Sequence, residues 1–237
     1  MPATLSNNVP GTEFSLGSDT ALNAIVDACD TIKFSAAASR NRVFIIEVQG
    51  ANCGFLATTA GLAAGAVTAY IPEEGISLCG IQRDIDHLKA RFREDKKQGR
   101  IILRNENSCN IYTTEVLTGI FMKEGSPVFD SRNTILGHLQ QGNSPSPLDR
   151  VRGTRLAVLC AQFIEDWIVK SPKRDDVPYS VYTMDENSSC VIGIKDGRIV
   201  YSPILALAAK DADMKKRISK STWWKSMHPL VKLLQKY

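Results

Sequence analysis

The chain has 237 residues, of which 43% are hydrophobic, and its formal net charge at pH 7 is +4. This length and hydrophobic content allow one or two domains with a sizeable core. Because the basic residues are spread among acidic ones, the composition argues against a nucleic-acid surface or a membrane-binding patch. No apolar run approaches the ~20 residues needed to cross a bilayer, so a soluble protein is expected.

Cysteine usage indicates a reducing compartment. The cysteines are widely spaced and form no Cys-x-x-Cys pair (Cys29, Cys53, Cys79, Cys109, Cys160 and Cys190). Because no signal peptide precedes them, we expect reduced thiols in a cytoplasmic protein. The same spacing gives no reason to expect a metal site.

The first half of the chain alternates helical and strand-like segments. Apolar residues recur at helical spacing from Ser18 towards Ala37, which predicts an amphipathic helix. The apolar and β-branched run Arg42–Val48 predicts a strand buried on both faces. An alanine- and glycine-rich helix is expected at residues 54–65 and a strand at residues 67–72. This alternation predicts an α/β fold with a parallel sheet flanked by helices.

The second half continues with longer and more polar segments. Helices are expected at residues 81–98, 113–123 and 150–169, a buried strand at 100–104, and a strand pair at 189–194 and 198–201 that turns through 195–197. We interpret residues 130–133 as a polar turn and residues 170–176 as a charged connector, while residues 203–210 predict no definite element. A helix that docks its apolar face is expected around Trp223, Trp224, Leu230, Leu233 and Leu234.

Three short blocks carry groups suited to a phosphorylated ligand. Residues 136–145 read Leu-Gly-His-Leu-Gln-Gln-Gly-Asn-Ser-Pro, which combines an imidazole, side-chain amides and backbone amides left open by glycine. Residues 4–13 and 47–54 add hydroxyl, amide and glycine groups. Ligands of open α/β sheets collect where strands end and loops begin, and these blocks are expected there. In order and spacing, the three blocks resemble the sugar-phosphate half-site of the phosphofructokinase family.

The resemblance extends over essentially the whole chain and is greatest to the carboxyl-terminal half of the animal enzymes. In those enzymes the amino-terminal half uses ATP and Mg²⁺ to convert fructose 6-phosphate to fructose 1,6-bisphosphate in glycolysis. The other half binds the allosteric activator fructose 2,6-bisphosphate. The resemblance implies that residues 1–237 are this regulatory half, with a phosphofructokinase-type sheet truncated at its amino-terminal side. It also implies a cytoplasmic homo-oligomer, expected to be a tetramer, with the amino-terminal catalytic half as a partner.

Departures from the family's catalytic pattern favour binding over catalysis. A catalytic Thr-Ile-Asp-Asn-Asp run uses its first aspartate to accept the proton of the attacking sugar hydroxyl. Here residues 4–8 read Thr-Leu-Ser-Asn-Asn, so Ser6 replaces that base and Asn8 replaces the second carboxylate. Gln141 stands where the catalytic pattern has a phosphate-binding arginine, and the Gly-Gly-Asp-Gly nucleotide loop is absent. Fewer anionic groups favour a second phosphate, so we expect no catalytic residue, metal site or ATP site in this segment.

The resemblance also implies a set of contacts for fructose 2,6-bisphosphate. Arg42, Arg132, Arg217 and His138 would supply positive charge, and Glu106 would accept hydrogen bonds from sugar hydroxyls. The family places the equivalents of Arg42 and Arg132 across a subunit boundary from the other contacts. The full expected set is Thr4, Leu5, Ser6, Asn7, Asn8, Arg42, Gln49, Gly50, Ala51, Glu106, Arg132, His138, Leu139, Gln140, Gln141 and Arg217.

Two departures from the regulatory pattern keep alternatives open. Residues 49–51 read Gln-Gly-Ala where the animal regulatory halves have Met-Gly-Gly, so Ala51 adds a methyl group where a sugar phosphate needs room, and Asn143 replaces a second glycine. One alternative is a catalytically inactive scaffold half with an empty pocket. A free-standing sugar kinase is disfavoured by Ser6 and the missing nucleotide loop, and a nucleic-acid module is the weakest alternative.

Each charged contact also has a simpler interpretation. Without the resemblance, Arg42 and Arg132 are most simply solvent-exposed, and Arg217 belongs to a run of charged residues that is typical of a solvated face. His138 is then most simply a structural histidine. The resemblance is what turns these residues into candidate ligand contacts.

Overall fold

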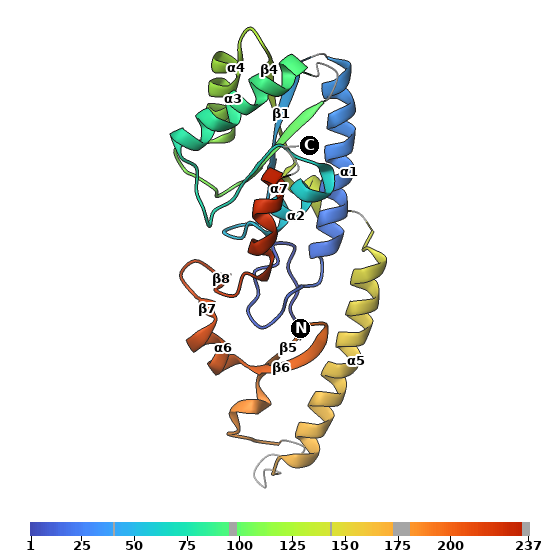
Figure 1. The fold of residues 1–237 in the computed structure, drawn as a ribbon. Helices are drawn as coiled ribbons and strands as arrows, with labels where there is room; N and C mark the ends of the chain where they lie inside the picture. Colours follow the sequence, from blue (N-terminus) through green and yellow to red (C-terminus); the bar gives the residue numbers. More distant parts are fainter. Residues whose placement is uncertain (40, 95–98, 143, 173–180, 234–237) are drawn as a thin grey trace. The chain divides into compact units, whose positions relative to one another are not determined.

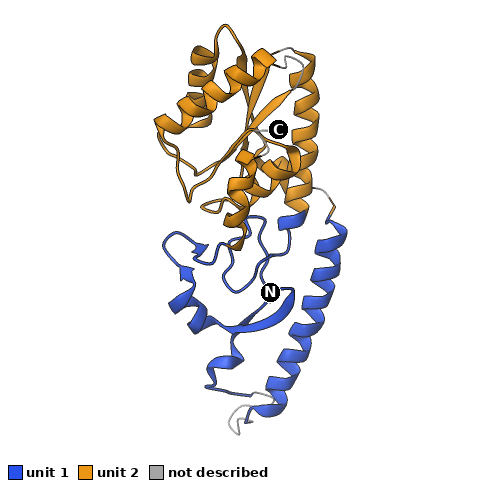
Figure 2. Cartoon of the chain, in the orientation of Figure 1, with its two compact units in different colours: residues 1–19, 145–222 blue, residues 20–144, 223–237 orange. Residues whose placement is uncertain are grey.

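A computed structural model describes residues 1–39, 41–94, 99–142, 144–172 and 181–233 (Figure 1). These residues form two compact units, which Figure 2 distinguishes by colour. Unit 1 consists of Met1–Asp19 and Pro145–Thr222, and unit 2 consists of Thr20–Ser144 and Trp223–Tyr237. Each unit therefore combines segments that are far apart in the sequence.

Unit 2 is built around a four-stranded parallel sheet with the order β2-β3-β1-β4 (Figure 1). The strands are β1 (Arg42–Val48), β2 (Ala69–Tyr70), β3 (Arg100–Asn105) and β4 (Asp130–Ile135). β1 pairs with β3 on one side and with β4 on the other. Because parallel neighbours need crossover connections, helices separate these strands along the chain. The parallel sheet flanked by helices confirms the predicted fold class.

The helices of unit 2 are α2 (Phe55–Ala64), α3 (Leu78–Glu94), α4 (Thr114–Gly125) and α7 (His228–Leu233), together with most of α1 (Ser18–Ala38). Two 3₁₀ helices, η1 (Gly137–Gln141) and η3 (Trp223–Met227), complete the unit. One core cluster joins the sheet to α3 and α4 through Ile45, Ile102, Leu88, Phe92, Leu117 and Phe121. Each such side chain contributes on the order of 1.5–3 kcal/mol when buried, so this packing fixes the positions of the strand ends.

Local signals in the sequence set several helix ends. Thr113 caps α4, because its side chain accepts a hydrogen bond from the amide of Val116. Gly65 ends α2 in a left-handed conformation with φ 63°, which glycine adopts without steric cost. The helices expected at residues 54–65 and 113–123 are thereby confirmed to within two residues.

Unit 1 contains one long helix and two small antiparallel sheets. Its elements are α5 (Pro147–Lys170), η2 (Glu186–Ser188), β5 (Cys190–Lys195), β6 (Arg198–Pro203), α6 (Ile204–Lys210), β7 (Ala212–Asp213) and β8 (Ile218–Ser219). The predicted hairpin is confirmed: β5 pairs with β6, and the turn uses Asp196 and Gly197 at φ 49° and 72°. The first residues of the chain lie against this hairpin, since the amide of Glu13 donates to the carbonyl oxygen of Ile194 at 2.8 Å.

The secondary structure of two segments differs from the one predicted from the sequence. Residues 130–133 are not a turn, because they belong to β4. This strand is an edge strand with one neighbour, so its outward positions stay polar and the pattern resembles a turn. Residues 203–210, which predicted no element, contain helix α6.

Other differences concern element bounds. α3 begins at Leu78 rather than at residue 81, α5 begins at Pro147, and β2 is reduced to Ala69–Tyr70. Val67 still pairs with the next strand, because its amide donates to the carbonyl oxygen of Ile101 at 2.8 Å. α5 continues through Lys170, where the connector was expected, while residues 95–98 and 173–176 lie outside the described residues.

The aromatic segment near the end docks as expected, through partly different residues. Trp224 and Val231 are buried, whereas Leu230 and Leu233 are 46% and 47% exposed. Leu234 lies outside the described residues. The rings of Trp223 and Trp224 lie 6.0 and 6.5 Å from that of Phe55 on α2, so packing on α2 holds the segment in unit 2. None of the helices in the described ranges could cross a membrane.

Candidate functional site

The loop after β1 is held by hydrogen bonds to Glu106. The backbone amides of Gly50 and Ala51 both donate to Glu106 Oε1, at 3.1 and 2.9 Å. A Cβ atom on Gly50 would lie 2.6 Å from Asn105 Nδ2, so only glycine permits this close approach. Ala51 has φ 50°, a left-handed conformation that costs most residues roughly 1–2 kcal/mol. The loop is therefore fixed in a conformation that favours glycine at both positions.

Gln140 joins η1 to the same loop. Its Oε1 accepts a hydrogen bond from the amide of Gln49 at 2.8 Å, and the residue is only 1% exposed. Its Nε2 is buried and has no hydrogen-bond partner among the described residues. The neighbouring His138, Leu139 and Gln141 are exposed, and His138 Nδ1 lies 3.2 Å from Gln141 Nε2. One of these four residues thus supports the loop, while the others face solvent.

Five of the predicted contacts therefore come together at the carboxyl ends of β1 and β3. They are Gln49, Gly50, Ala51, Glu106 and Gln140, which three hydrogen bonds tie into one cluster. Because Glu106 Oε1 already accepts two backbone N–H groups, Oε2 is the oxygen left for a further hydrogen-bond donor. The cluster offers amides, a carboxylate oxygen and an exposed imidazole at the edge of a rigid sheet.

Arg104 supports this cluster and was not among the predicted contacts. Its guanidinium donates to Glu47 Oε2 at 2.9 Å and to the carbonyl oxygens of Glu106, Cys109 and Tyr112 at 3.2, 2.8 and 3.2 Å. Its side chain is 3% exposed, and Glu47 also accepts a hydrogen bond from Thr114. The signal in the sequence was an arginine that directly follows the apolar run of residues 101–103 in a buried strand, since a buried guanidinium needs several acceptors.

Two further groups help to place the loop that leads into α2. The amide of Gly54 donates to Glu73 Oε1 at 2.9 Å, and Asn105 Nδ2 donates to the carbonyl oxygen of Cys53 at 3.0 Å. Burial raises the pKa of the Glu73 carboxyl group and raises the pKa of the Cys53 thiol to about 12. Cys53 is therefore protonated at neutral pH and is a packing group rather than a nucleophile. All cysteines of the chain are free thiols.

Arg42 and Arg132 lie at a different place on the sheet. Arg42 begins β1, opposite Asp130 at the start of β4, and Arg132 follows two residues later on the same face. Asp130 Oδ2 lies 3.8 Å from Arg42 Nε and 3.2 Å from Arg132 Nη2. At ~3.3 Å per residue, the length of β1 separates Arg42 from Gln49 by roughly 20 Å. Arg42 therefore does not join the cluster within unit 2.

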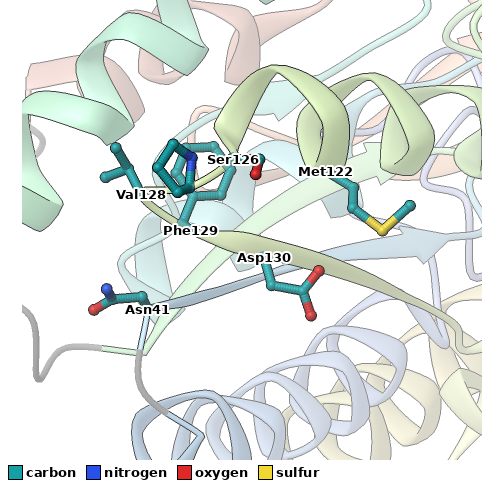
Figure 3. A pocket seen from close by; sticks show the side chains of 7 residues that line it. Asn41, Met122, Ser126, Val128, Phe129 and Asp130 are labelled. Atoms are coloured by element: carbon teal, nitrogen blue, oxygen red, sulfur yellow. The ribbon is translucent and has the colours of Figure 1, made fainter.

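A cavity of about 350 Å³ opens beside Asp130 (Figure 3). It is lined by Asn41, Met122, Ser126, Pro127, Val128, Phe129 and Asp130. The labelled carboxylate of Asp130 and the side chain of Met122 are drawn at its wall in Figure 3. Asn41 Oδ1 is buried without a hydrogen-bond partner in the described part of the chain. This end of the sheet thus combines two arginines, one aspartate and open space.

The remaining predicted contacts belong to unit 1. Asn7 is 8% exposed and uses its side chain internally: Nδ2 donates to the carbonyl oxygen of Glu13 at 2.8 Å, and Oδ1 accepts from the amide of Ser15 at 2.7 Å. Asn8 Nδ2 donates to the carbonyl oxygen of Arg217 at 2.9 Å. This bond brings the Thr4–Leu5–Ser6–Asn7–Asn8 run next to the turn between β7 and β8 that carries the exposed Arg217 side chain.

Comparison with known proteins identifies the family of the chain. The family model described as Phosphofructokinase matches residues 1–164. The chain belongs to this family. The ATP-dependent 6-phosphofructokinase of Aspergillus fumigatus is 46% identical over 99% of the chain, and the platelet-type enzyme of Homo sapiens is 43% identical over the whole chain. These identities do not separate fungal from animal relatives.

Solved phosphofructokinase structures share the fold. The structure of phosphofructokinase from Saccharomyces cerevisiae matches with a TM-score of 0.92 and 38% identity, covering 99% of this chain and 32% of that one. The phosphofructokinase of Pichia pastoris in the T-state matches with a TM-score of 0.88 and 42% identity, over 99% of this chain and 27% of that one. The chain spans only 29% of the length of the Aspergillus and human relatives.

Membership of the phosphofructokinase family bears on the three blocks that suggested it. The three blocks are residues 4–13, 47–54 and 136–145. All three lie within residues 1–164, which the family model matches. Asn143 lies outside the described residues, so its backbone conformation is not described. Ala51 adopts a left-handed conformation that suits glycine.

Proposed function

We propose that the chain is the carboxyl-terminal, regulatory part of an animal-type ATP-dependent 6-phosphofructokinase and binds fructose 2,6-bisphosphate. The observation that carries the proposal is the cluster of Gln49, Gly50, Ala51, Glu106 and Gln140, formed by two loops and η1 at the carboxyl edge of the sheet. Its amides and carboxylate suit a sugar, and the adjacent exposed His138 suits a phosphate.

Neutral residues at three positions that are charged in the catalytic pattern support a binding role rather than a catalytic one. Ser6, Asn8 and Gln141 replace the acids and the arginine of the catalytic pattern, which leaves no general base at Ser6. In the complete enzyme, phosphate transfer from ATP to fructose 6-phosphate in glycolysis would then be the task of the other half. That half would hold ATP and Mg²⁺, and this segment would set the activity through the allosteric ligand.

The proposal includes assembly of several copies in the cytoplasm, with a tetramer as the expected form. Support comes from the roughly 20 Å that β1 places between Arg42 and the cluster at Gln49. A phosphate held at the cluster can reach Arg42 and Arg132 only if a second copy supplies them. Binding then stabilises the assembled state, because each site needs groups from two copies.

A scaffold half with an empty pocket is the second candidate. It is favoured by Ala51, whose methyl group stands where the family has glycine, and by Glu106, whose Oε1 already accepts hydrogen bonds from the loop. In that case, the chain would fold and assemble normally without sugar-phosphate affinity.

Calorimetric titration of the purified, size-characterised protein with fructose 2,6-bisphosphate tests the proposal. Fructose 6-phosphate serves as the ligand control, and Arg93→Ala, at an exposed position of α3, serves as the matched control for Arg132→Ala. Because a charge-assisted hydrogen bond is worth about 1.5–3 kcal/mol, Arg132→Ala should weaken binding by roughly tenfold or more. Arg93→Ala should leave it unchanged.

Three results would argue against the proposal. A folded oligomer that does not bind the bisphosphate favours the scaffold. Equal affinity in a monomer and in the oligomer contradicts the shared site. Turnover of fructose 6-phosphate and ATP by the purified chain would show that it is itself a kinase.

A further inference from the structure

The arginine pair at the amino end of β1 and β4 shares one acidic neighbour, Asp130. Arg42 and Asp130 are register partners on neighbouring strands, and Arg132 lies two residues beyond Asp130 on the same face of β4. A single oxygen, Asp130 Oδ2, lies 3.8 Å from Arg42 Nε and 3.2 Å from Arg132 Nη2. The other oxygen, Oδ1, accepts a hydrogen bond from the amide of Ser131 at 2.9 Å.

This arrangement leaves the cations only partly satisfied. Arg42 Nη1 donates to Ser39 Oγ at 3.0 Å, but its buried Nε has no hydrogen-bond acceptor among the described residues. Arg132 is 56% exposed at its side chain and has Asp130 as its one ion-pair partner in the described part of the chain. Two guanidinium groups thus share one carboxylate, which leaves a local excess of one positive charge.

Asp130 also has room to move. Its side chain is 37% exposed and forms part of the wall of the 350 Å³ cavity in Figure 3. The carboxylate can rotate towards this space and away from the arginines without displacing a packed side chain. An incoming phosphate can therefore replace Oδ2 as the acceptor of both guanidinium groups, which bind phosphate in preference to a single carboxylate because of its greater charge.

The geometry points to Asp130 as a built-in competitor of the ligand: it occupies Arg42 and Arg132 when no phosphate is bound and so sets their affinity for phosphate. This inference deepens the proposed function and rests on it for the sugar bisphosphate. For a bare phosphate ligand it rests only on the three side chains. If Asp130 instead served only to hold the arginines in place, its removal would weaken phosphate binding.

The solvent exposure of the two Asp130–arginine ion pairs sets the size of the expected change in phosphate affinity. Partly exposed ion pairs are each worth at most about a fivefold change in an equilibrium constant. Replacing Asp130 by asparagine keeps an oxygen for the Ser131 amide, removes the competing charge and removes its repulsion of the ligand. Asp130→Asn should therefore tighten phosphate binding by roughly three- to tenfold, with a larger effect at low ionic strength.

The experiment compares the wild-type chain, Asp130→Asn and Asp86→Asn by calorimetric titration. Asp86→Asn makes the same change of net charge at an exposed position of α3 that no ion pair joins to either arginine. Each protein is titrated with pyrophosphate and, separately, with fructose 2,6-bisphosphate. Asp130→Ser, which also removes the charge, is used if Asp130→Asn does not fold.

Tighter pyrophosphate binding by Asp130→Asn, and not by Asp86→Asn, supports the inference. Unchanged or weaker binding by Asp130→Asn overturns it, as does the same increase in both variants or the absence of pyrophosphate binding by all proteins. If pyrophosphate binding tightens while fructose 2,6-bisphosphate binds to none of the proteins, the competitor role of Asp130 stands and the proposed function fails.

Discussion

Removing the Glu106 carboxylate tests the geometry of the cluster most directly. Glu106→Ala leaves the amides of Gly50 and Ala51 without their acceptor, and of these two residues Gly50 is buried whereas Ala51 is partly exposed. An unsatisfied buried donor costs about 1–3 kcal/mol, whereas water can reach the second amide. We therefore expect the free energy of unfolding of unit 2 to fall by about 1–3 kcal/mol.

Glu106→Gln provides the internal comparison, because its carbonyl oxygen can accept both hydrogen bonds. Its cost should stay below about 1 kcal/mol. Urea unfolding gives both values, with Glu124→Ala as a control at an exposed site on α4, and hydrogen exchange reports the amides of residues 50 and 51 separately. The reasoning is refuted if Glu106→Ala costs no more than the control, or if the alanine and glutamine variants lose equal stability and protection.

Three further changes have expected outcomes. Arg104→Met should lower the unfolding free energy by about 3–5 kcal/mol in urea, because it leaves the partly buried Glu47 without its cation and three carbonyl oxygens without their donor; a loss below 1 kcal/mol would contradict this. Ala51→Gly should raise it by about 0.5–1 kcal/mol by relieving the left-handed backbone, whereas a loss of stability would show that the methyl group packs. Burial raises the pKa of Asp84 above its ordinary 3.8, so the folded state binds the proton more tightly and wild-type stability should fall as pH rises from 3.8 through the raised pKa. Asp84→Asn keeps an acceptor for the Tyr70 hydroxyl and should reduce this fall; equal pH slopes of unfolding free energy would contradict it.

The sequence predicted the buried elements best. The run Arg42–Val48 was predicted with its bounds, because an apolar, β-branched segment between a helix and a glycine loop has few other solutions. β4 was missed because a polar edge strand lacks the hydrophobic signal that marks an inner strand. Helix α6 was missed for a related reason, since none of its residues is buried. In β4 and α6, low burial removed the hydrophobic pattern on which the prediction depended.

Some residues of the candidate site were found from the sequence, and others only from the structure. The resemblance supplied Gln49, Glu106 and Gln140, and the structure brings them together. It did not supply Arg104 or Asp130, because each acts through partners that are distant in sequence: Arg104 bonds to Glu47 on another strand, and Asp130 pairs with Arg42 across the sheet. Such pairings depend on strand register, which the residues of one strand do not encode.

The position of the two arginines limits what one copy of the chain can do. β1 is held on both sides, by β3 through Val43 to Val48 and by β4 through Arg42 to Glu47, so its ends cannot approach one another without loss of these ladders. A ligand at the Gln49 loop and a ligand at Arg42 are therefore either two ligands of one copy or one ligand shared by two. Only the second arrangement makes phosphate affinity depend on assembly, and a dilution series of the bisphosphate titration separates the two. Affinity that falls as oligomers dissociate requires a shared site, while affinity independent of protein concentration requires separate sites.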